Sequence, residues 1–416
     1  MNIELPFNMD FIINLTYRCN LRCKMCTQYG KNYKEQAIEE MNIQDWINFL
    51  NDIKDVTPKP KLILMGGEPF LYKDFEKLFK IAVSYNLKTH IITNGYYLDK
   101  FIPILKDTDT DITISLDGLF NVHDEIRNQK NLFKKVVQNI KLIDEAQKSG
   151  SKMRMRINQV ILPENVDKVA DFYNYFKDYD IDTFTFQHLQ SSDEELNNLT
   201  QKQWRERLGQ DYCMGLIPKE KYNLNAAFAN RYINATKDFI KNYSPEKCFS
   251  FPALAYEELA DYYTNNNLDN LRKNMICTTA WTTPAIEPNG NVSNCIGNII
   301  GNLKENSFWD IWNNDKAQKL RDALITDGKF TICTKCCNFY KGNFIAAPEG
   351  KLEINGYKLE LPDVLNYIQS SKCVAFIRDT DREQKNEYIP VIPINIHRPQ
   401  YLDFIKKENE IITIIE

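Results

Sequence analysis

Short apolar runs alternate with amphipathic segments along the first half of the chain. The runs are rich in β-branched residues, as buried strands are. The segments between them place apolar residues three and four positions apart, as one face of a helix does. The expected strands lie at residues 11–17, 61–66, 88–95, 111–118, 154–161 and 182–189, and the clearest helical stretches are IQDWINFLNDI, FEKLFKIAVSY and FKKVVQNIKLIDEA.

This regular alternation predicts an α/β fold with a parallel sheet covered by helices. Six strand-helix units over residues 1–190 would make a partial (β/α)6 TIM-like barrel, whose chemistry lies at the C-terminal ends of the strands. Polar and cysteine-containing motifs follow the first four expected strands, so they are expected to meet at one rim.

The second half of the chain has a different pattern. Residues 191–276 are helical and polar, which predicts a bridge or a substrate-facing elaboration. Residues 277–340 hold a second group of cysteines, and Asn289-Gly290 within them indicates a tight hairpin. Residues 341–416 are expected to form a C-terminal α+β extension, with an Asn-Gly hairpin in LEINGYKLEL and an edge strand in YIPVIPINI.

Composition narrows the class of protein. The 416 residues are 43% hydrophobic, which predicts a large buried interior and two or three domains. A net charge of -4 gives no general attraction to nucleic acid or to anionic membranes. No targeting segment or membrane-spanning run is evident, so we expect a cytoplasmic protein. In that reducing compartment, seven of the eleven cysteines are better explained by metal ligation than by disulfides.

The stretch YRCNLRCKMC places Cys19, Cys23 and Cys26 directly after the first expected strand. Structural zinc sites normally have four ligands, whereas three ligands leave a position open for a substrate or cofactor. Thiolates suit zinc or iron-sulfur clusters, and the four histidines are too far apart in sequence to complete the set in an obvious way.

CNLRCKMC resembles the CxxxCxxC signature of the radical S-adenosylmethionine (SAM) enzymes. The resemblance covers about the first 190 residues and implies a 4Fe-4S cluster on Cys19, Cys23 and Cys26, with SAM on the fourth iron. It further implies contacts with SAM. The backbone of Gly66, Gly67, Glu68 and Pro69 would receive the amino group of the cofactor, and Ser115 and Asp117 would lie at the ribose. Asn94 and Arg127 would make further contacts, and Met25 would lie near adenine.

Alternatives remain open at several of these positions. The cysteine spacing could arise by chance or bind zinc. Asn94 could simply end a strand at an Asn-Gly turn, and Asp117 beside Gly118 could serve only turn chemistry. Arg127 could be a solvated residue near the start of a helix.

The resemblance implies a radical mechanism. A reduced cluster would cleave SAM, and the resulting 5′-deoxyadenosyl radical would remove hydrogen from an unactivated carbon, while the protein positions the reactants and excludes water. The enzyme would then be an oxidoreductase that needs an external one-electron donor such as flavodoxin or ferredoxin. A non-catalytic iron-sulfur sensor is the alternative of another class.

The second cysteine group resembles the auxiliary-cluster region of SPASM and twitch radical enzymes. One auxiliary 4Fe-4S cluster is implied on Cys277, Cys295, Cys333 and Cys336, and structural zinc on the same thiolates is the alternative. Cys337 is a possible hydrogen-atom donor, an alternative ligand or a buried small hydrophobe. Burial alone is also expected for Cys213, Cys248 and Cys373.

The resemblance implies a substrate that is a peptide or protein, modified by a crosslink, a thioether or an epimerisation. Oxidation or epimerisation of a sugar or another small metabolite is the alternative. Because Cys19 leaves no room for a leader-binding domain before the barrel, a separate leader-peptide recognition protein is a possible partner.

Overall fold

The structure is a computed structural model. It describes residues 3–4, 9–27, 39–212, 216–242, 247–252, 254, 256–264, 275–277, 279–327, 329–336, 343–345, 351–354, 357–360, 375–378 and 388–391.

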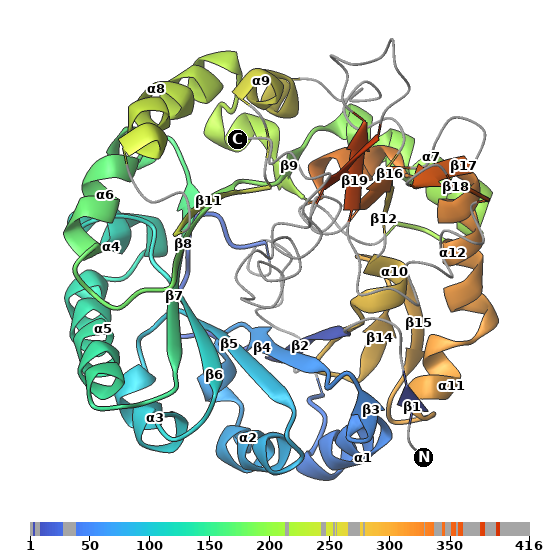
Figure 1. Cartoon of the computed structure of the whole chain (residues 1–416), viewed down its shortest axis with the longest axis horizontal. Coiled ribbons are helices and arrows are strands. Elements are labelled where there is room, and N and C mark those ends of the chain that lie inside the picture. Colours follow the sequence, from blue (N-terminus) through green and yellow to red (C-terminus); the bar gives the residue numbers. More distant parts are fainter. Residues whose placement is uncertain are drawn as a thin grey trace.

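Six parallel strands form the centre of a ten-stranded sheet, in the spatial order β8-β7-β6-β5-β4-β2. They curve in an arc with helices on the outer side, which is the architecture of an open α/β barrel (Figure 1). All six strands expected from the sequence therefore form: β2 (Asp10–Thr16), β4 (Lys61–Gly66), β5 (Lys88–Thr93), β6 (Thr110–Ser115), β7 (Arg154–Ile161) and β8 (Thr183–His188).

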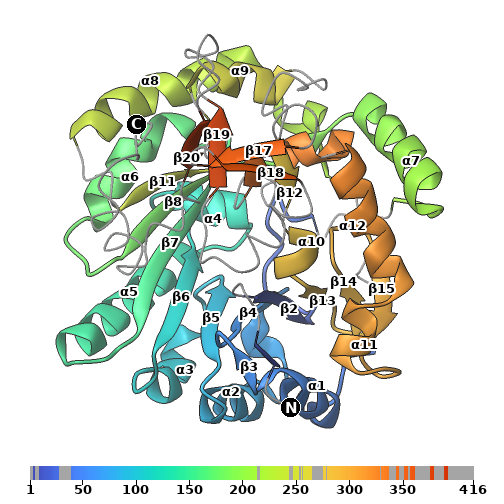
Figure 2. The ribbon, with the colours of Figure 1, turned by 45° about the vertical axis from the view of Figure 1, so that its right-hand side comes forward.

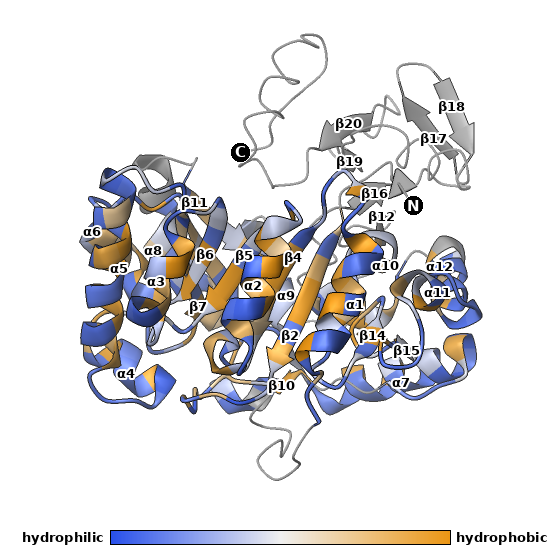
Figure 3. Ribbon diagram, turned by 90° about the horizontal axis from the view of Figure 1, so that it is seen from below, coloured by the Kyte–Doolittle hydropathy of each residue, from blue (hydrophilic) through white to orange (hydrophobic). Residues whose placement is uncertain are grey.

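The helices between these strands cover the outer face of the sheet. The first begins at a capping box in which the Asn42 side chain accepts from the Asp45 N–H and the Asp45 carboxylate accepts from the Asn42 N–H. Apolar residues gather along the strands and on the sheet-facing sides of the helices (Figure 3). The outer helices are α1 (Ile43–Ile53), α2 (Phe75–Ser84), α3 (Leu98–Leu105), α4 (Asn121–Arg127), α5 (Leu132–Lys148) and α6 (Val169–Phe176).

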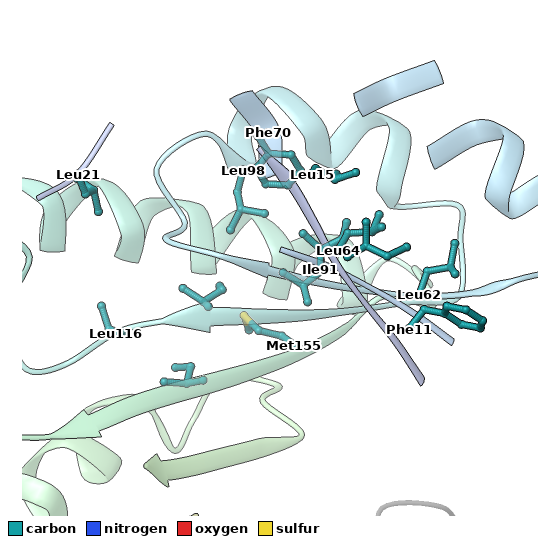
Figure 4. Close-up of a cluster of buried hydrophobic side chains, with 14 of the residues drawn as sticks. Phe11, Leu15, Leu21, Leu62, Leu64, Phe70, Ile91, Leu98, Leu116 and Met155 are labelled. Carbon is teal, nitrogen blue, oxygen red and sulfur yellow. The ribbon is translucent and has the colours of Figure 1, made fainter. Parts of the chain in front are cut away.

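The helix-covered face of the sheet is the apolar core. Phe11, Leu62, Leu64, Ile91 and Met155 are each at most 1% exposed and lie between the strands and helices (Figure 4). Burying such side chains contributes roughly 1.5–3 kcal/mol each. The alternation of strand residues then turns their neighbours in sequence to the opposite face.

The inner face of the sheet carries polar pairs instead. His90 Nε2 lies 2.7 Å from Thr113 Oγ1, and Asn158 Nδ2 donates to Gln187 Oε1 at 3.0 Å. Strands with one apolar and one polar face are unusual in a closed α/β barrel, whose interior is packed. The open arc therefore presents polar groups toward its centre.

Short strands from the second half of the chain extend both edges of the sheet. β11 (Cys248–Phe251) pairs parallel with β8, although the sequence pattern predicted only helix in that region. On the other edge, β13 (Ala285–Ile286) pairs parallel with β2 and forms an antiparallel hairpin with β14 (Asn291–Ser293) (Figure 2). This confirms the Asn-Gly hairpin, in which Gly290 has φ +93°. β15 (Ile299–Asn302) completes the edge.

A second, smaller core lies between α7 (Glu194–Leu208) and α12 (Asp315–Asp327). Trp204 of α7 and Leu320 of α12 are fully buried there, in the same cluster as Cys277 and Cys333. Part of the 191–276 region thus connects to the second cysteine group. Its remaining helices are α8 (Ala226–Asn242) and α9 (Tyr256–Thr264), and the cysteine region also contains β12 (Met275–Cys277), α10 (Thr279–Thr282), α11 (Phe308–Trp312) and the 3-10 helix η5 (Thr331–Lys335).

The last part of the chain contains short antiparallel pairs. β17 (Lys351–Ile354) pairs with β18 (Tyr357–Glu360), which confirms the second expected hairpin, and β19 (Ala375–Arg378) pairs with β20 (Tyr388–Val391). β16 (Asn343–Ile345) pairs with β12. Among the described residues, no helix has the length and apolar character needed to cross a membrane.

Further short elements complete the described chain, namely β1 (Ile3–Glu4), β3 (Val56–Thr57), β9 (Ser191–Ser192), β10 (Ile217–Pro218), η2 (Pro69–Leu71), η3 (Val166–Lys168) and η4 (Lys219–Tyr222).

Candidate functional site

The first three cysteines lie in the loop that follows β2, at the C-terminal rim of the sheet. Hydrogen bonds to and from its backbone hold this loop against its surroundings. The Lys24 N–H donates to the Ile126 carbonyl of α4 at 2.9 Å, and Lys221 Nζ donates to the Lys24 carbonyl at 2.6 Å. The Cys26 N–H donates to the Cys23 carbonyl at 3.2 Å, which closes a turn inside the loop. The loop is therefore fixed from both sides.

All three thiols are half-buried, and the sulfur atoms of Cys19 and Cys23 meet N–H groups of the protein. Cys19 Sγ accepts from the Leu21 N–H at 3.4 Å, and Cys23 Sγ from Arg127 Nη1 at 3.7 Å. Burial is the main cause that raises the pKa of the Cys19 thiol to about 11, and the negative charges of Glu68, Cys23 and Cys26 act in the same direction. Three thiolates with so little exposure to solvent need a positively charged partner to be stable.

The two glycines after β4 are required by the close approach of two chain segments. A Cβ at Gly66 would lie 2.4 Å from the Thr16 carbonyl oxygen, and a Cβ at Gly67 only 2.3 Å from the Arg18 carbonyl oxygen. The Gly67 and Glu68 N–H groups donate to these same carbonyls at 2.7 and 2.9 Å. The approach that the structure shows is thus between the GGEP loop and the cysteine loop, and a contact with the SAM amino group stays a prediction.

Glu68 joins three strand ends beneath the site. It is fully buried, and its carboxylate accepts from Thr93 Oγ1 at 2.8 Å and from the Asn94 N–H at 2.9 Å. Burial raises the pKa of Glu68 to about 7 in spite of these donors. Pro69 is buried at the start of η2, so it shapes the loop after the two glycines.

Asn94 points from the end of β5 toward the cysteine loop. Its Nδ2 donates to Asn20 Oδ1 at 2.9 Å and lies 4.0 Å from Cys19 Sγ, while its Oδ1 accepts from the Tyr96 N–H at 3.0 Å. Asn94 therefore shapes its own turn and also contacts the cysteine loop, and its contact with SAM stays a prediction.

Asp117 and Arg127 form a buried ion pair beside Cys23. Asp117 Oδ2 accepts from Arg127 Nε at 2.5 Å, and Oδ1 accepts from the Val160 N–H at 2.9 Å. Burial alone would lower the pKa of Arg127, but the charges of Asp117 and Cys23 outweigh it and raise that pKa. Since Arg127 is 8% exposed, it is not the solvated helix residue considered as an alternative. Ser115 is half-buried at the end of β6 nearby.

Met25, between Cys23 and Cys26 in the cysteine loop, joins the apolar core and is 8% exposed. Sequence reasoning missed other residues that shape the site. Glu40 pairs with Arg18 and accepts from the Thr16 hydroxyl, and Asn165 Nδ2 donates to the Asp117 carbonyl at 2.6 Å. A lone Glu or Asn far along the chain carries no motif, so no signal in a single sequence could have identified these contacts.

The second cysteine group is also brought together. Cys277 and Cys333 are buried, and Cys295 and Cys336 are half-buried against the same small core. Burial raises the pKa of the Cys295 thiol far above its usual range, with further increases from the charges of Cys333 and Cys277. The group is tied to the barrel because Gln190 Nε2, just after β8, donates to the Lys335 carbonyl at 3.2 Å.

In neither cysteine group, nor elsewhere in the described residues, do three Cys, His, Asp or Glu side chains converge as closely as a bound metal ion requires. Of the other thiols, Cys248 is only half-buried in β11, less than the burial expected from the sequence. Cys213, Cys337 and Cys373 lie outside the described residues, so the proposed roles of Cys337 stay predictions.

Family models match the two cysteine regions separately. The radical SAM superfamily model matches residues 13–186, which contain the barrel strands and the first cysteine loop. A SPASM model, described as an iron-sulfur cluster-binding domain, matches residues 277–337. Residues 13–186 belong to the radical SAM superfamily.

Curated relatives of this radical SAM chain cover it to different extents. It is 30% identical to the sporulation killing factor maturation protein SkfB of Bacillus subtilis over 38% of this chain and 37% of that protein. It is 23% identical to an AdoMet-dependent heme synthase of Methanosarcina barkeri over 84% and 95% of the two chains. The matches span only about a third to a half of the first curated relatives.

Among solved structures, SuiB of Streptococcus suis bound to S-adenosylmethionine has the same fold. Its TM-score is 0.56 at 18% identity, over 80% of this chain and 72% of that chain. SuiB has also been solved with its precursor peptide SuiA. At this identity the likeness establishes the fold alone.

Proposed function

We propose that this protein is a radical SAM enzyme that modifies a peptide or protein. The observation that carries the proposal is the convergence of the cysteine loop, the GGEP loop and the Asp117–Arg127 pair at one rim of the barrel. A purely structural zinc site would need neither the glycines nor the buried guanidinium. The same convergence argues against a non-catalytic sensor.

The donor set fits a 4Fe-4S cluster with a SAM-binding position. Three thiols alone supply soft ligands and leave one iron open. N–H groups at Cys19 and Cys23 are the outer contacts that commonly tune such clusters. When bound, the cluster and SAM together supply the one-electron cleavage that generates an alkyl radical.

The residues of the chain then serve binding and positioning. Cys19, Cys23 and Cys26 would hold the cluster. The GGEP backbone, Asn94 and Ser115 would contact SAM, and Met25 would line its adenine side. Asp117 has both carboxylate oxygens engaged, which favours a role in holding Arg127 over a direct ribose contact.

A peptide or protein substrate is supported by two similarities. One relative is a maturation protein, and a protein of the same fold has been solved with a precursor peptide. A small-molecule substrate is the second candidate, because the heme synthase relative matches most of the chain. An external one-electron donor and a separate leader-recognition protein belong to the first proposal as partners.

One auxiliary 4Fe-4S cluster on Cys277, Cys295, Cys333 and Cys336 completes the proposal. It is supported by the shared burial of these thiols and by the iron-sulfur family match. We retain the division into a barrel at 1–190, a bridge at 191–276, an auxiliary region at 277–340 and an extension at 341–416 as part of the proposal.

The first test measures SAM cleavage and its hydrogen source. Anaerobically reconstituted protein, given reductant and SAM, should release 5′-deoxyadenosine, and replacing Cys19, Cys23 and Cys26 together by alanine should reduce it to the level of a sample without protein. A uniformly deuterated host extract, split into peptide and small-metabolite fractions, identifies the substrate class. Deuterium arriving from the peptide fraction supports the proposal, and label from the other fraction favours the heme-synthase-like candidate. Absence of product contradicts both.

The second test counts metals. Wild type should hold about eight iron atoms, and Cys295→Ala with Cys333→Ala should lower this to about four, because one of two 4Fe-4S clusters is lost. Iron and zinc are measured together by mass spectrometry, and Cys248→Ala is the matched control because that thiol belongs to neither group. A zinc atom that disappears in the double variant, with iron unchanged, would establish the structural zinc alternative.

A further inference from the structure

Where β13 pairs with β2, two polar side chains hold buried acceptor oxygens without a donor: Asn14 is buried, and Glu287 is half-buried. Asn14 lies on β2 and is 9% exposed, and Glu287 directly follows β13. Within the described part of the chain, neither Asn14 Oδ1 nor Glu287 Oε2 has a hydrogen-bond partner. A buried acceptor without a donor is costly and rare in a folded protein.

Strand register brings these two residues together. β13 runs parallel to β2, with Ala285 opposite Ile12 and Ile286 opposite Ile13 (Figure 2). Glu287 and Asn14 are the next positions on the two strands, which lie about 4.8 Å apart. Because Ile13 and Ile286 are buried in the core, their neighbours in sequence turn to the inner face of the sheet.

The hairpin fixes the position of the carboxyl group. The Glu287 N–H donates to the Asn291 carbonyl, and the Gly290 N–H donates to the Glu287 carbonyl, both at 2.9 Å. The Met41 N–H donates to the Pro288 carbonyl at 2.7 Å, which anchors the turn to the barrel. Asn14 precedes Thr16, the residue that contacts the GGEP loop, by only two positions. The acceptors thus lie on rigid elements beside the proposed active site.

The acceptor oxygens of Asn14 and Glu287 favour a ligand that donates hydrogen bonds. Burial raises the pKa of Glu287 to about 7. An apolar group placed here would leave both oxygens unsatisfied, whereas an ammonium group has three N–H donors and a charge opposite to that of the carboxylate. A trapped water molecule would satisfy the oxygens without selecting any ligand.

We propose that Asn14 and Glu287 form a subsite for a protonated amine of the substrate, such as a lysine side chain of a peptide. The inference rests on the proposed function in that it places the substrate on the inner face of the barrel. It adds the chemical group that is recognised there.

The test measures binding rather than turnover. Reconstituted protein with saturating SAM is titrated calorimetrically with Ac-Ala-Ala-Lys-Ala-Ala-amide and with its norleucine counterpart, which has the same shape at the central residue without the ammonium group. We expect the lysine peptide to bind at least about tenfold more tightly, because a hydrogen bond to a charged group in a buried site typically changes the affinity by about this factor. Glu287→Gln and Asn14→Ala should each reduce that ratio, the first to near one.

Glu305→Gln is the matched control, since that carboxylate is exposed, and it should keep the preference. Equal binding of the two peptides by wild type, or no binding up to millimolar concentrations, would overturn the subsite, as would a lysine preference that survives in Glu287→Gln. Release of 5′-deoxyadenosine by the same preparation is recorded separately, so a failure of the proposed function is distinguished from a failure of the subsite.

Discussion

Gly67→Ala should destabilise the protein by about 3 kcal/mol and abolish SAM cleavage. The new Cβ would lie 2.3 Å from the Arg18 carbonyl oxygen and 2.7 Å from the Arg18 carbonyl carbon, so the GGEP and cysteine loops must move apart. Overpacking of this kind costs typically 1–3 kcal/mol, and the backbone atoms here cannot rotate away as a side chain can. Urea unfolding gives the stability, and 5′-deoxyadenosine release gives the activity.

Gly150→Ala is the matched control. Gly150 has φ +97°, and a Cβ there would meet nothing within 4 Å, so this variant carries only the backbone cost of about 1–2 kcal/mol. It should keep its SAM cleavage, because it lies in a loop far along the chain from the cysteine and GGEP motifs. If Gly67→Ala were no more harmful than Gly150→Ala, the close contact between the two loops would not hold the site together.

The central barrel was predictable because its signals are local. Each of the six central strands is marked by a short β-branched run, and α1, α2 and α5 by apolar spacing of three and four residues. β11 was not predictable, since CFSF is a four-residue segment without alternation whose pairing with β8 depends on tertiary contacts. The pairing of β13 with β2 was also not predictable, because a single sequence does not show which strands lie side by side in the sheet.

The candidate site also combines local motifs, which the sequence reveals, with contacts between distant residues, which it does not. Cys19, Cys23, Cys26 and the GGEP motif are recognisable from residue type and spacing, and the structure brings them together. The roles within the set were less accessible: Asp117 engages Arg127 and the Val160 N–H, and Glu68 ties strand ends together. Such contacts join residues many positions apart, so they become visible only when the fold is known.

The Asp117–Arg127 pair should show strong coupling in a double-mutant cycle. Asp117→Asn leaves Arg127 buried without its counter-charge, and Arg127→Met leaves Asp117 with only the Val160 N–H as donor. Removing one partner of a buried ion pair costs about 3–5 kcal/mol, whereas removing both charges costs much less. The double variant should therefore be more stable than either single variant, as measured by urea unfolding of the reconstituted protein.

The same cycle separates stability from site chemistry. Arg127 Nη1 contacts Cys23 Sγ, so the double variant would regain stability but still lack the guanidinium beside this proposed cluster ligand. A cluster that loses a cation or an N–H donor at sulfur is harder to reduce. The reduction potential of the reconstituted protein should thus be lower in Arg127→Met and remain low in the double variant. Recovery of both stability and potential in the double variant would show that the pair acts only on the fold, and additive losses of stability would show that the two charges are not coupled.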